Sequence, residues 1–242
     1  APTLKEKYYE FDMAGIWIVV GNPNLKAEVS HNFNLSAEYA KGAYSFTLNG
    51  YYNNITNKIA TGSPYLLKPT DPIPHLSYIN LAAHSVIGME AVAQCHWRNG
   101  LTARLAYTLT DEYLPRNKSG ERMSAQYIPA RKHALMVHAD WEHRFHKNFG
   151  MTFGIDGRYL SGVTNPEYID YYDVSKGMRD IEYPGYTLWK FSAAGQFKKG
   201  VKVTLALDNL FNYRPKYYYL NSPLTDGINV MLGVSIDVDK LF

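Results

Sequence analysis

The sequence has little of several features that would point to common classes of protein. It contains one cysteine, Cys95, which excludes an internal disulfide and a cysteine-rich zinc site. No stretch approaches the roughly 18–20 unbroken apolar residues that a transmembrane helix needs. The formal net charge is only +3, without a clustered basic helix, so nothing indicates a nucleic-acid partner. The chain also opens without the basic and apolar regions of a signal peptide, so we expect a processed or partial secreted protein.

Catalytic signatures are missing as well. The sequence has no His-Glu-x-x-His, no Gly-x-Ser-x-Gly and no phosphate-binding loop. His138, His143 and His146 lie close in sequence, but on a strand His143 would face away from the other two, which argues against a shared metal. The sequence therefore predicts neither an enzyme nor a metal site, and Cys95 is interpreted as a small apolar residue.

What the sequence has in abundance is alternation of apolar and polar residues with a period of two. Its 21 tyrosines and 14% aromatic content are also high. Residues 228–238 show the pattern most clearly, because every second residue is a branched apolar one and the residues between are polar or small, except Met231. A helix would mix these two sets, so the pattern predicts strands. Nine such strands are expected, at residues 29–40, 44–55, 78–97, 101–109, 135–145, 149–159, 189–197, 201–208 and 228–238.

Three further features distinguish a membrane barrel from a soluble all-β fold, the alternative reading. The apolar faces carry no Asp, Glu, Lys or Arg in their central stretches, and the strands exceed the usual five or six residues. The connections also alternate in length, as in outer-membrane barrels, where short turns are periplasmic and long loops extracellular. Short turns fall near residues 41–42, 98–100, 146–148 and 198–200, and long loops near 56–76, 114–130, 163–185 and 213–227.

The odd number of strands has a geometric consequence. In an antiparallel meander the first and ninth strands run in the same direction, so they cannot close on each other, and bacterial single-chain barrels have even strand numbers. Two open edges in lipid would leave backbone groups unsatisfied. We therefore expect further strands, on the same polypeptide or on another chain, and a chain that begins in an extracellular loop.

Several short motifs together resemble those of TonB-dependent outer-membrane receptors. Ala1-Pro2 is followed by Asn22-Pro23-Asn24-Leu25-Lys26-Ala27-Glu28, similar to the family's Asn-Pro-(Asp/Asn)-Leu-Lys-Pro-Glu signature with Ala27 in place of proline. Asn209-Leu210-Phe211 resembles the element of the penultimate strand, residues 127–133 resemble the entry into a downward strand, and the chain ends on an aromatic residue, Phe242. The resemblance implies that residues 1–242 form the C-terminal part of a 22-stranded transmembrane barrel, without the plug domain, the TonB box and the early strands.

The resemblance also implies a function. It predicts active import of a scarce iron-containing ligand, haem or a ferric siderophore, across the Gram-negative outer membrane, energised through TonB. No covalently bound cofactor is expected. The implied partners are the N-terminal plug, the remaining barrel strands, the TonB complex, and lipid and lipopolysaccharide. Haem receptors of the family carry a histidine between the first two motifs, and residues 1–28 contain none, so both cargoes stay open. The alternatives are a cobalamin or other nutrient transporter, a structural barrel fragment, and a passive porin.

Candidate ligand-binding residues lie in the expected extracellular loops. Flat aromatic surface beside polar groups suits a haem, corrin or catecholate ligand, although an outer aromatic girdle would use the same residues. The basic segment 116–122 could attract an anionic ligand or lipopolysaccharide, or be a solvated loop tip. The ligand candidates are His75, Tyr168, Tyr171, Tyr172, Tyr217 and Tyr218.

Overall fold

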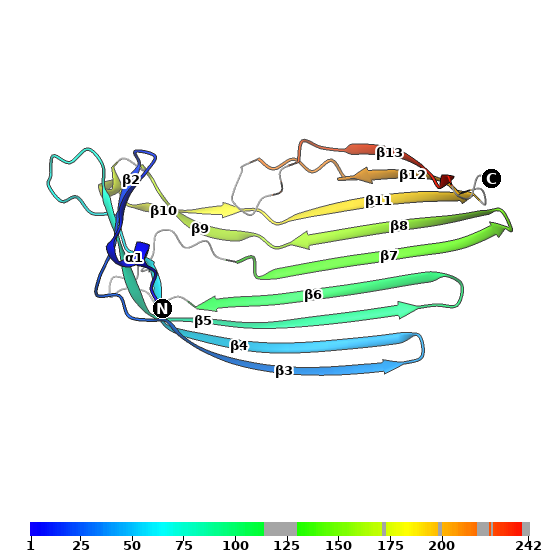
Figure 1. Ribbon diagram of the computed structural model, residues 1–242, viewed down its shortest axis with the longest axis horizontal. Helices are drawn as coiled ribbons and strands as arrows, with labels where there is room; N and C mark the ends of the chain where they lie inside the picture. The colour runs from blue at the N-terminus through cyan, green and yellow to red at the C-terminus, as the bar shows by residue number, and fades with distance from the viewer. Residues whose placement is uncertain (114–129, 171–172, 198–199, 217–222, 224, 239–242) are drawn as a thin grey trace.

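Nine long antiparallel strands form one sheet in the computed structural model, which describes residues 1–113, 130–170, 173–197, 200–216, 223 and 225–238. The strands pair in chain order, so the nine strands expected from the alternation are confirmed (Figure 1). They are β3 (Val29–Lys41), β4 (Tyr44–Thr61), β5 (His75–His96), β6 (Leu101–Tyr113), β7 (His133–His146), β8 (Phe149–Leu160), β11 (Tyr186–Phe197), β12 (Val201–Asp208) and β13 (Asn229–Ile236).

The register of these strands places the alternating apolar residues in continuous rows across the sheet. Because side chains at paired positions share a face, each row shows which residues lie together. One row consists of Tyr39, Phe46, Ala93, Leu105, Val137, Gly157 and Trp189. The next consists of Tyr44, Cys95, Ala103, Ala139, Ile155, Phe191, Leu207 and Val230. We call this side of the sheet the apolar face and the opposite side the polar face.

The apolar face is not buried against other protein. On β4 the apolar side chains Tyr44, Phe46 and Leu48 are exposed, whereas the polar residues between them are the more sheltered set. At the two edges of the sheet Leu35 is 80% exposed and Leu232 is 74% exposed. Soluble monomers rarely expose a contiguous apolar surface of this extent, so the apolar face requires a cover other than water.

Two bands of aromatic side chains border the apolar face. Near the short turns, Tyr44 meets Trp97, and Phe145, Phe149 and Phe197 stack in series. Towards the long loops lie Phe33 stacked on Tyr52, then Tyr107, Tyr159, and Trp189 in edge contact with Phe211. Phe149 and Tyr159 are ten residues apart on β8, and at about 3.3 Å per residue with a tilt of about 40° this spacing rises about 25 Å. That height matches the apolar belt of a transmembrane barrel.

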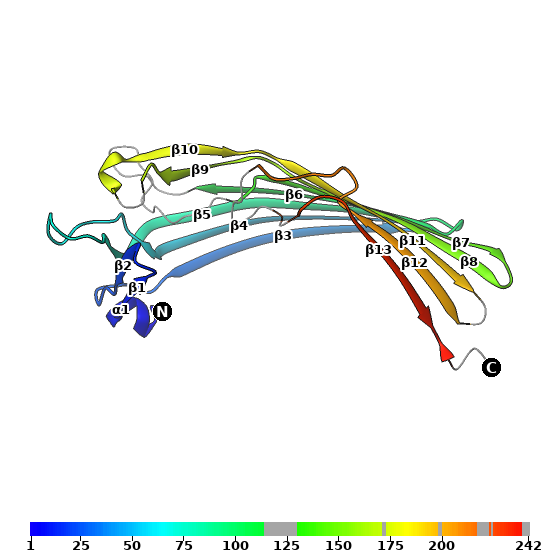
Figure 2. The same ribbon diagram turned by 90° about the horizontal axis from the view of Figure 1, so that it is seen from above.

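The connections segregate as the sequence predicts. The strand ends that flank the short turns lie at one end of the sheet, and the strand ends that flank the long connections lie at the other, together with the N-terminus (Figure 1). The sheet is curved and does not close (Figure 2). β3 and β13 form its two edges and run in the same direction, so the expectation of an open, partial barrel wall is confirmed.

Several short elements at the long-loop end were not predicted. The expected loop 163–185 contains a hairpin of β9 (Val163–Tyr168) and β10 (Met178–Tyr183), with the 3-10 turn η1 (Val174–Lys176) at its tip. The N-terminal segment forms α1 (Leu4–Tyr8), β1 (Glu10–Met13) and β2 (Trp17–Val20). β2 pairs with the start of β5 in parallel, Ile18 opposite His75, whereas only antiparallel pairing was expected. β4 also continues six residues beyond the expected Ile55, so the first long connection is shorter than predicted.

These elements pack into what we call the cap, formed by residues 1–28, the β4–β5 connection with the start of β5, and residues 161–186. Apart from Cys95 near the turn end of β5, the most buried apolar side chains among the described residues gather here or at the adjoining end of β5. They are Val19, Leu25, Leu76, Leu81, Tyr168, Tyr183 and Tyr186. The hydrophobic core of the chain is therefore mainly in its cap. The long strands form a single-layered sheet, which we call the wall.

The turn between β5 and β6 depends on a glycine. Gly100 has a φ of +84°, its carbonyl accepts from the Glu142 amide, and a Cβ at this position would collide with the Glu142 carbonyl oxygen. Gly42 has a φ of +60° but open space around it. We expect Gly100→Ala to lower the free energy of unfolding by about 2 kcal/mol and Gly42→Ala by about 1 kcal/mol, since only the first adds a backbone displacement to the strained φ. Urea unfolding of both variants in lipid vesicles would check this. Equal losses of unfolding free energy in the two variants would show that the contact with the Glu142 carbonyl oxygen adds nothing to the effect of the strained φ.

Candidate functional site

The Asn-Pro motif anchors the cap to the wall. The Asn22 side chain donates to the Tyr78 carbonyl of β5 (2.9 Å), and its backbone amide donates to the Glu6 carbonyl of α1 (2.8 Å). The motif thus joins two segments that are far apart in sequence. Pro23 lies in the turn that follows, and the turn closes with the Leu25 amide donating to the Asn22 carbonyl. Leu25 is buried.

The packing around this motif is tight. A Cβ at Gly21 would lie 2.6 Å from the backbone of Lys7, so only glycine lets the two segments approach. Ala1 and Pro2 precede α1, whose capping box links Thr3 and Glu6 reciprocally. The hydrogen bonds from Thr3 hold the pKa of the Glu6 carboxyl below its usual value. These contacts assign the N-terminal motif a structural role in the described part of the chain.

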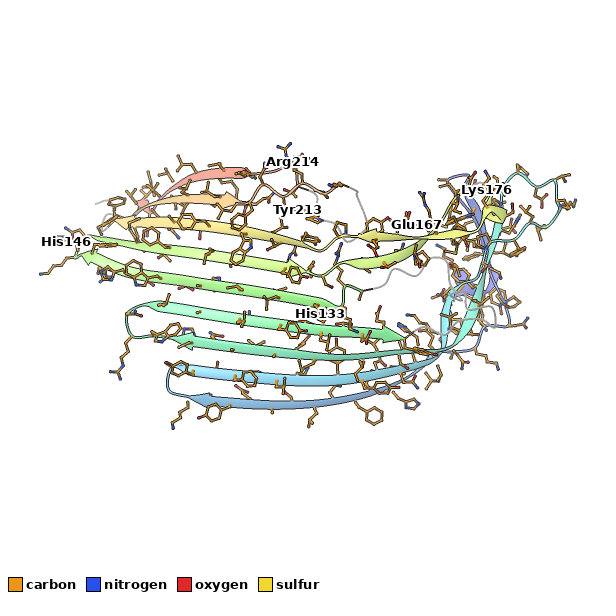
Figure 3. All side chains as sticks on the ribbon, turned by 180° about the vertical axis from the view of Figure 1, so that it is seen from behind. His133, His146, Glu167, Lys176, Tyr213 and Arg214 are labelled. Atoms are coloured by element: carbon orange, nitrogen blue, oxygen red, sulfur yellow. The ribbon has the colours of Figure 1, made fainter. Side chains whose placement is uncertain are left out.

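The second motif builds a corner at the end of β12. Asn209 and Asn212 both have left-handed backbones, with φ of +53° and +54°, a region that asparagine tolerates better than most residues. The Asn209 amide donates to the Tyr213 carbonyl (2.7 Å) and to Thr225 Oγ1 (3.0 Å), and its Oδ1 accepts from the Tyr213 amide (2.8 Å). Asn209 is only 7% exposed. The motif therefore turns the chain from β12 into the following loop, whose Tyr213 and Arg214 are labelled in Figure 3.

The remaining motif residues sit at the aromatic band. The Leu210 amide donates to the Trp189 carbonyl of β11 (2.8 Å), which fixes the corner to the neighbouring strand. Phe211 is exposed and lies in edge contact with Trp189, so it extends the outer aromatic band. Phe242 lies outside the described residues.

Two of the six ligand candidates, Tyr168 and His75, lie among the described residues, and both are in the cap. Tyr168 is 8% exposed, packs edge-on against Trp17, and burial raises its pKa to about 12. His75 is 7% exposed, and its ring lies beside that of Tyr65. Both contribute to the packing of the cap, and their role in ligand binding stays a prediction. The other four candidates, Tyr171, Tyr172, Tyr217 and Tyr218, lie outside the described residues.

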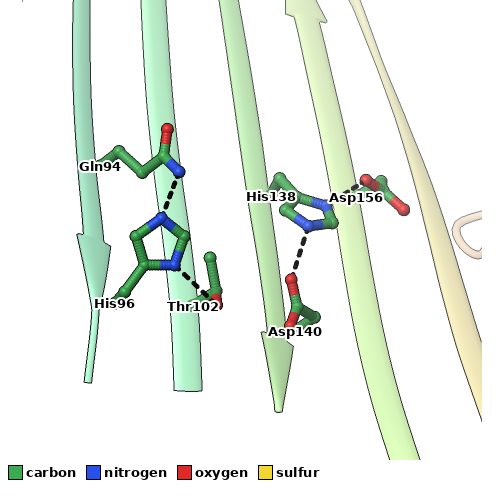
Figure 4. A network of polar contacts seen from close by, with 6 residues as sticks. All are labelled: Gln94, His96, Thr102, His138, Asp140 and Asp156. Atoms are coloured by element: carbon green, nitrogen blue, oxygen red, sulfur yellow. Dashed lines mark hydrogen bonds and ion pairs between the residues drawn. The ribbon is translucent and has the colours of Figure 1, made fainter. Parts of the chain in front are cut away.

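His138 lies on the polar face and His143 on the apolar face, as the alternation predicts. A register shift after Arg144 pairs His146 with Phe149 of the apolar face, so the expectation that His146 shares the face of His138 was wrong. Figure 3 places His133 at the long-loop end of the strand and His146 at the turn end. His138 is on the polar face between two carboxylates, with Nδ1 2.7 Å from Asp156 and Nε2 2.9 Å from Asp140 (Figure 4). A search of the described residues finds no group of His, Cys, Asp and Glu side chains arranged to hold a metal ion.

A row of polar and charged residues crosses the polar face through this histidine. Neighbouring strands place Gln94 opposite Arg104, Arg104 opposite His138, and His138 opposite Asp156. The row continues through Lys190 to Asp208, whose side chains lie 3.5 Å apart. His96, bonded to Gln94 and Thr102, adds a second polar group beside the row (Figure 4). Opposite charges on adjacent strands stabilise the pairing of the strands. Most charged side chains of this row therefore have a partner within the row or beside it.

A hollow of about 650 Å³ opens on the polar face above this row. Its floor is apolar, formed by Ala106, Met136 and Leu188, and its loop side is formed by Asn209 and Thr225 of the corner. Its charged rim consists of Arg104, His138, Asp156, Arg158, Lys190 and Asp208. The volume falls in the range of small-molecule sites. We call it the arginine pocket.

The sequence drew attention to His138 and Asn209 but not to the other residues of this pocket. Arg104 and Arg158 stand at polar positions of their strands, where a charged residue is unremarkable. A usable signal was present in the pattern, because β6, β8 and β11 each place a basic residue on the polar face with small or apolar residues two positions away. Only the register brings these positions together.

The fold and its motifs match a known family. A family model described as "TonB dependent receptor-like, beta-barrel" matches residues 1–210. The chain therefore belongs to the TonB-dependent receptor family. Members of this family are receptors and transporters of outer membranes rather than enzymes. No helix in the described part of the chain combines the length and the apolar character needed to cross a bilayer.

Solved structures of such receptors share the fold. The FrpB iron transporter of Neisseria meningitidis (F3-3 variant) aligns with a TM-score of 0.65 at 18% identity, covering 87% of this chain and 31% of its own. The pyoverdine receptor FpvA of Pseudomonas aeruginosa, bound to pyoverdine, aligns with a TM-score of 0.65 at 18% sequence identity. The alignment covers 88% of this chain and 30% of FpvA. A G324V mutant of the ferric enterobactin receptor PfeA of Pseudomonas aeruginosa aligns with a TM-score of 0.58 at 20% sequence identity. The alignment covers 81% of this chain and 27% of PfeA.

The chain spans about a third of the length of these receptors. A search of curated protein sequences returned no match. At these identities the solved structures establish the fold, and the expected family is confirmed by the family model.

Proposed function

We propose that this chain forms part of the wall and the outer loops of an outer-membrane transporter that imports an iron chelate, energised through TonB. In this proposal the apolar face contacts lipid and lipopolysaccharide, the polar face lines the lumen, the short turns are periplasmic, and the cap is extracellular. The observation that carries it is the combination of an aromatic-bordered apolar face with a ligand-sized pocket on the opposite face.

The chemistry of the cargo is proposed from two supports. The receptors with the same fold are described as an iron transporter and as receptors for ferric enterobactin and pyoverdine. The pocket itself offers an apolar floor and a rim with three basic side chains, Arg104, Arg158 and Lys190, against two acidic ones, Asp156 and Asp208. The excess of positive charge suits a chelate with carboxylate or catecholate groups. Haem, an anionic planar ligand, stays within the proposal together with ferric siderophores.

An active transporter is favoured over a passive porin by the cap. β1, β2, β9 and β10 pack over the loop end of the wall, with Trp17 against Tyr168. A porin needs an open aqueous lumen, whereas packed elements at the mouth suit the capture of one ligand at a time. We propose that the plug domain and further barrel strands, on the same or a separate chain, complete the transporter and supply the contact with TonB.

Uptake of radioactive iron by cells that produce the receptor at its natural length tests this function. The panel would contain haem, a ferric tricatecholate, a neutral ferric trihydroxamate and cobalamin labelled with cobalt. We expect saturable uptake of at least one iron ligand that disappears in a strain without TonB. Uptake that is linear in concentration and independent of TonB would indicate a porin, and uptake of cobalamin alone would replace the iron cargo.

A further inference from the structure

We propose that basic side chains at the short turns bind the phosphate groups of anionic phospholipids in the periplasmic leaflet of the membrane. The turn rim, as we call this surface, consists of Lys41, Arg98 and Lys147. The inference rests on the orientation in the proposed function, where the short turns are periplasmic and the apolar face meets lipid. Three observations carry it, namely the single sign of the charge, the height of the rim and the aromatic side chains beside it.

The charge at the turn end of the apolar face has one sign. From the row of Leu105 to the turns, the apolar-face positions of the described strands hold no Asp or Glu. Lys41, Arg98 and Lys147 are all exposed. Three short turns are described in full, and they contain no acidic residue either, at 42–43, 97–100 and 147–148.

The loop end of the wall differs, because its charges are of both signs and form pairs. Lys132 Nζ lies 2.9 Å from an Asp111 carboxylate oxygen. In the β9–β10 hairpin, Lys176 Nζ lies 2.7 Å from an Asp170 carboxylate oxygen. Pairs of this kind leave little net charge for an anionic headgroup. The excess of positive charge is therefore a property of the turn end, where the periplasmic leaflet is expected.

The rest of a complete receptor would leave the turns of Arg98 and Lys147 open to lipid. These turns join β5 to β6 and β7 to β8, and each of the four strands already has a paired neighbour on both sides. Further barrel strands would attach beyond the sheet edges, β3 and β13, and a plug would fill the side of the polar face. Lys41 ends the edge strand β3, so the proposal depends least on this residue.

The rim lies at the height of the lipid phosphates. Phe149 begins β8 in the aromatic band near the turns, and Lys147 precedes it by two residues. At about 3.3 Å per residue and a tilt of about 40°, Lys147 lies about 5 Å outside that band. The headgroup region of each leaflet is about 5–8 Å thick. A long basic side chain there keeps its stem against apolar surface and its charge among the headgroups.

Aromatic side chains lie beside the basic ones. Tyr44 is opposite Lys41 in the register, and its ring meets that of Trp97 edge-on at 6.4 Å. Arg98 follows Trp97, and the Trp141 indole nitrogen donates to the carbonyl of the next residue in this turn (3.1 Å). Tyrosine and tryptophan gather at membrane interfaces, and arginine donates two parallel hydrogen bonds to a phosphate. This combination suits a phosphodiester headgroup whose acyl chains lie along the apolar face.

The test measures lipid binding to the receptor at its natural length in a neutral detergent. Phosphatidylglycerol and phosphatidylcholine are titrated separately, and native mass spectrometry gives the Kd of the first lipids retained. The variants are Arg98→Gln/Lys147→Gln and the charge-preserving Arg98→Lys/Lys147→Arg. The matched control, Arg144→Gln/Lys202→Gln, removes two charges from one row of the polar face at the same end of the wall. The heat-modifiable band on a gel checks that each variant is folded.

We expect the wild type to bind phosphatidylglycerol at least about tenfold more tightly than phosphatidylcholine. The glutamine variant should lose most of this preference, because each basic side chain near the headgroups contributes about fivefold. The charge-preserving variant and the control should keep the preference, and an excess of soluble glycerol phosphate should not displace the lipid.

The proposal is overturned if the wild type binds both lipids equally, if the glutamine variant keeps the preference, or if the control loses as much. Displacement by glycerol phosphate would also overturn it, since that result indicates a site for a soluble phosphate. TonB-dependent iron uptake by the wild type, measured separately, decides the proposed function whatever the lipid result.

Discussion

Replacing Leu105 with arginine is expected to lower the free energy of unfolding by about 2–4 kcal/mol, the cost of placing a charge in the middle of the lipid-facing belt of a transmembrane barrel. Leu105 is the central residue of the apolar set on β6, between Ala93 and Val137 in the register, and it is exposed on the apolar face. No acidic side chain shares its row, so the new charge would have no partner there. The measurement is urea unfolding of the receptor folded into phosphatidylcholine vesicles.

Thr108→Arg is the matched control on the same strand. Thr108 lies on the polar face, where the register places it opposite Glu90, so an arginine there gains a carboxylate neighbour and keeps access to water. We expect a loss below about 1 kcal/mol for this variant. If the two variants were equally destabilised, the assignment of lipid and lumen to the two faces would be wrong. If Thr108→Arg were the more damaging, the faces would be reversed.

The long strands could be predicted from sequence because each has one apolar face and one polar face along its whole length, and each face meets the same surroundings throughout. Alternation then survives from Val29 to Lys41 on β3 and from Asn229 to Ile236 on β13, and the nine strands follow from it. The cap lacks this property. Val19, Leu76 and Leu81 are covered by packed elements on more than one side, so the residues around them no longer alternate and the short strands there escaped prediction.

The site was predictable in part for a related reason. The asparagine motifs were visible as short patterns, but their role depends on contacts such as Asn22 to Tyr78 that span the cap and the wall. Tyr168 was expected on a loop surface and is instead packed against Trp17, since a tyrosine suits a buried position as well as an exposed one. Arg104 and Arg158 were not noticed because a charged residue at a polar position is ordinary. Only the register shows that their neighbours are already paired.

The corner at Asn209 leads to the second large expected effect. Asn209→Ala removes three hydrogen bonds, to the Tyr213 carbonyl, the Tyr213 amide and Thr225 Oγ1, at a position that is nearly fully buried. At about 1 kcal/mol for each bond, we expect a loss of about 3 kcal/mol in the free energy of unfolding. Asn209→Asp keeps the acceptor but loses the two donated bonds, so an intermediate loss is expected.

Asn212→Ala separates these hydrogen bonds from backbone strain. Asn212 has nearly the same left-handed φ as Asn209, but its side chain is exposed, so its replacement should cost only about 1 kcal/mol from the strained backbone. Thermal unfolding followed by the β-sheet circular dichroism signal compares the three variants, and equal losses for Asn209→Ala and Asn212→Ala would assign the whole effect to φ.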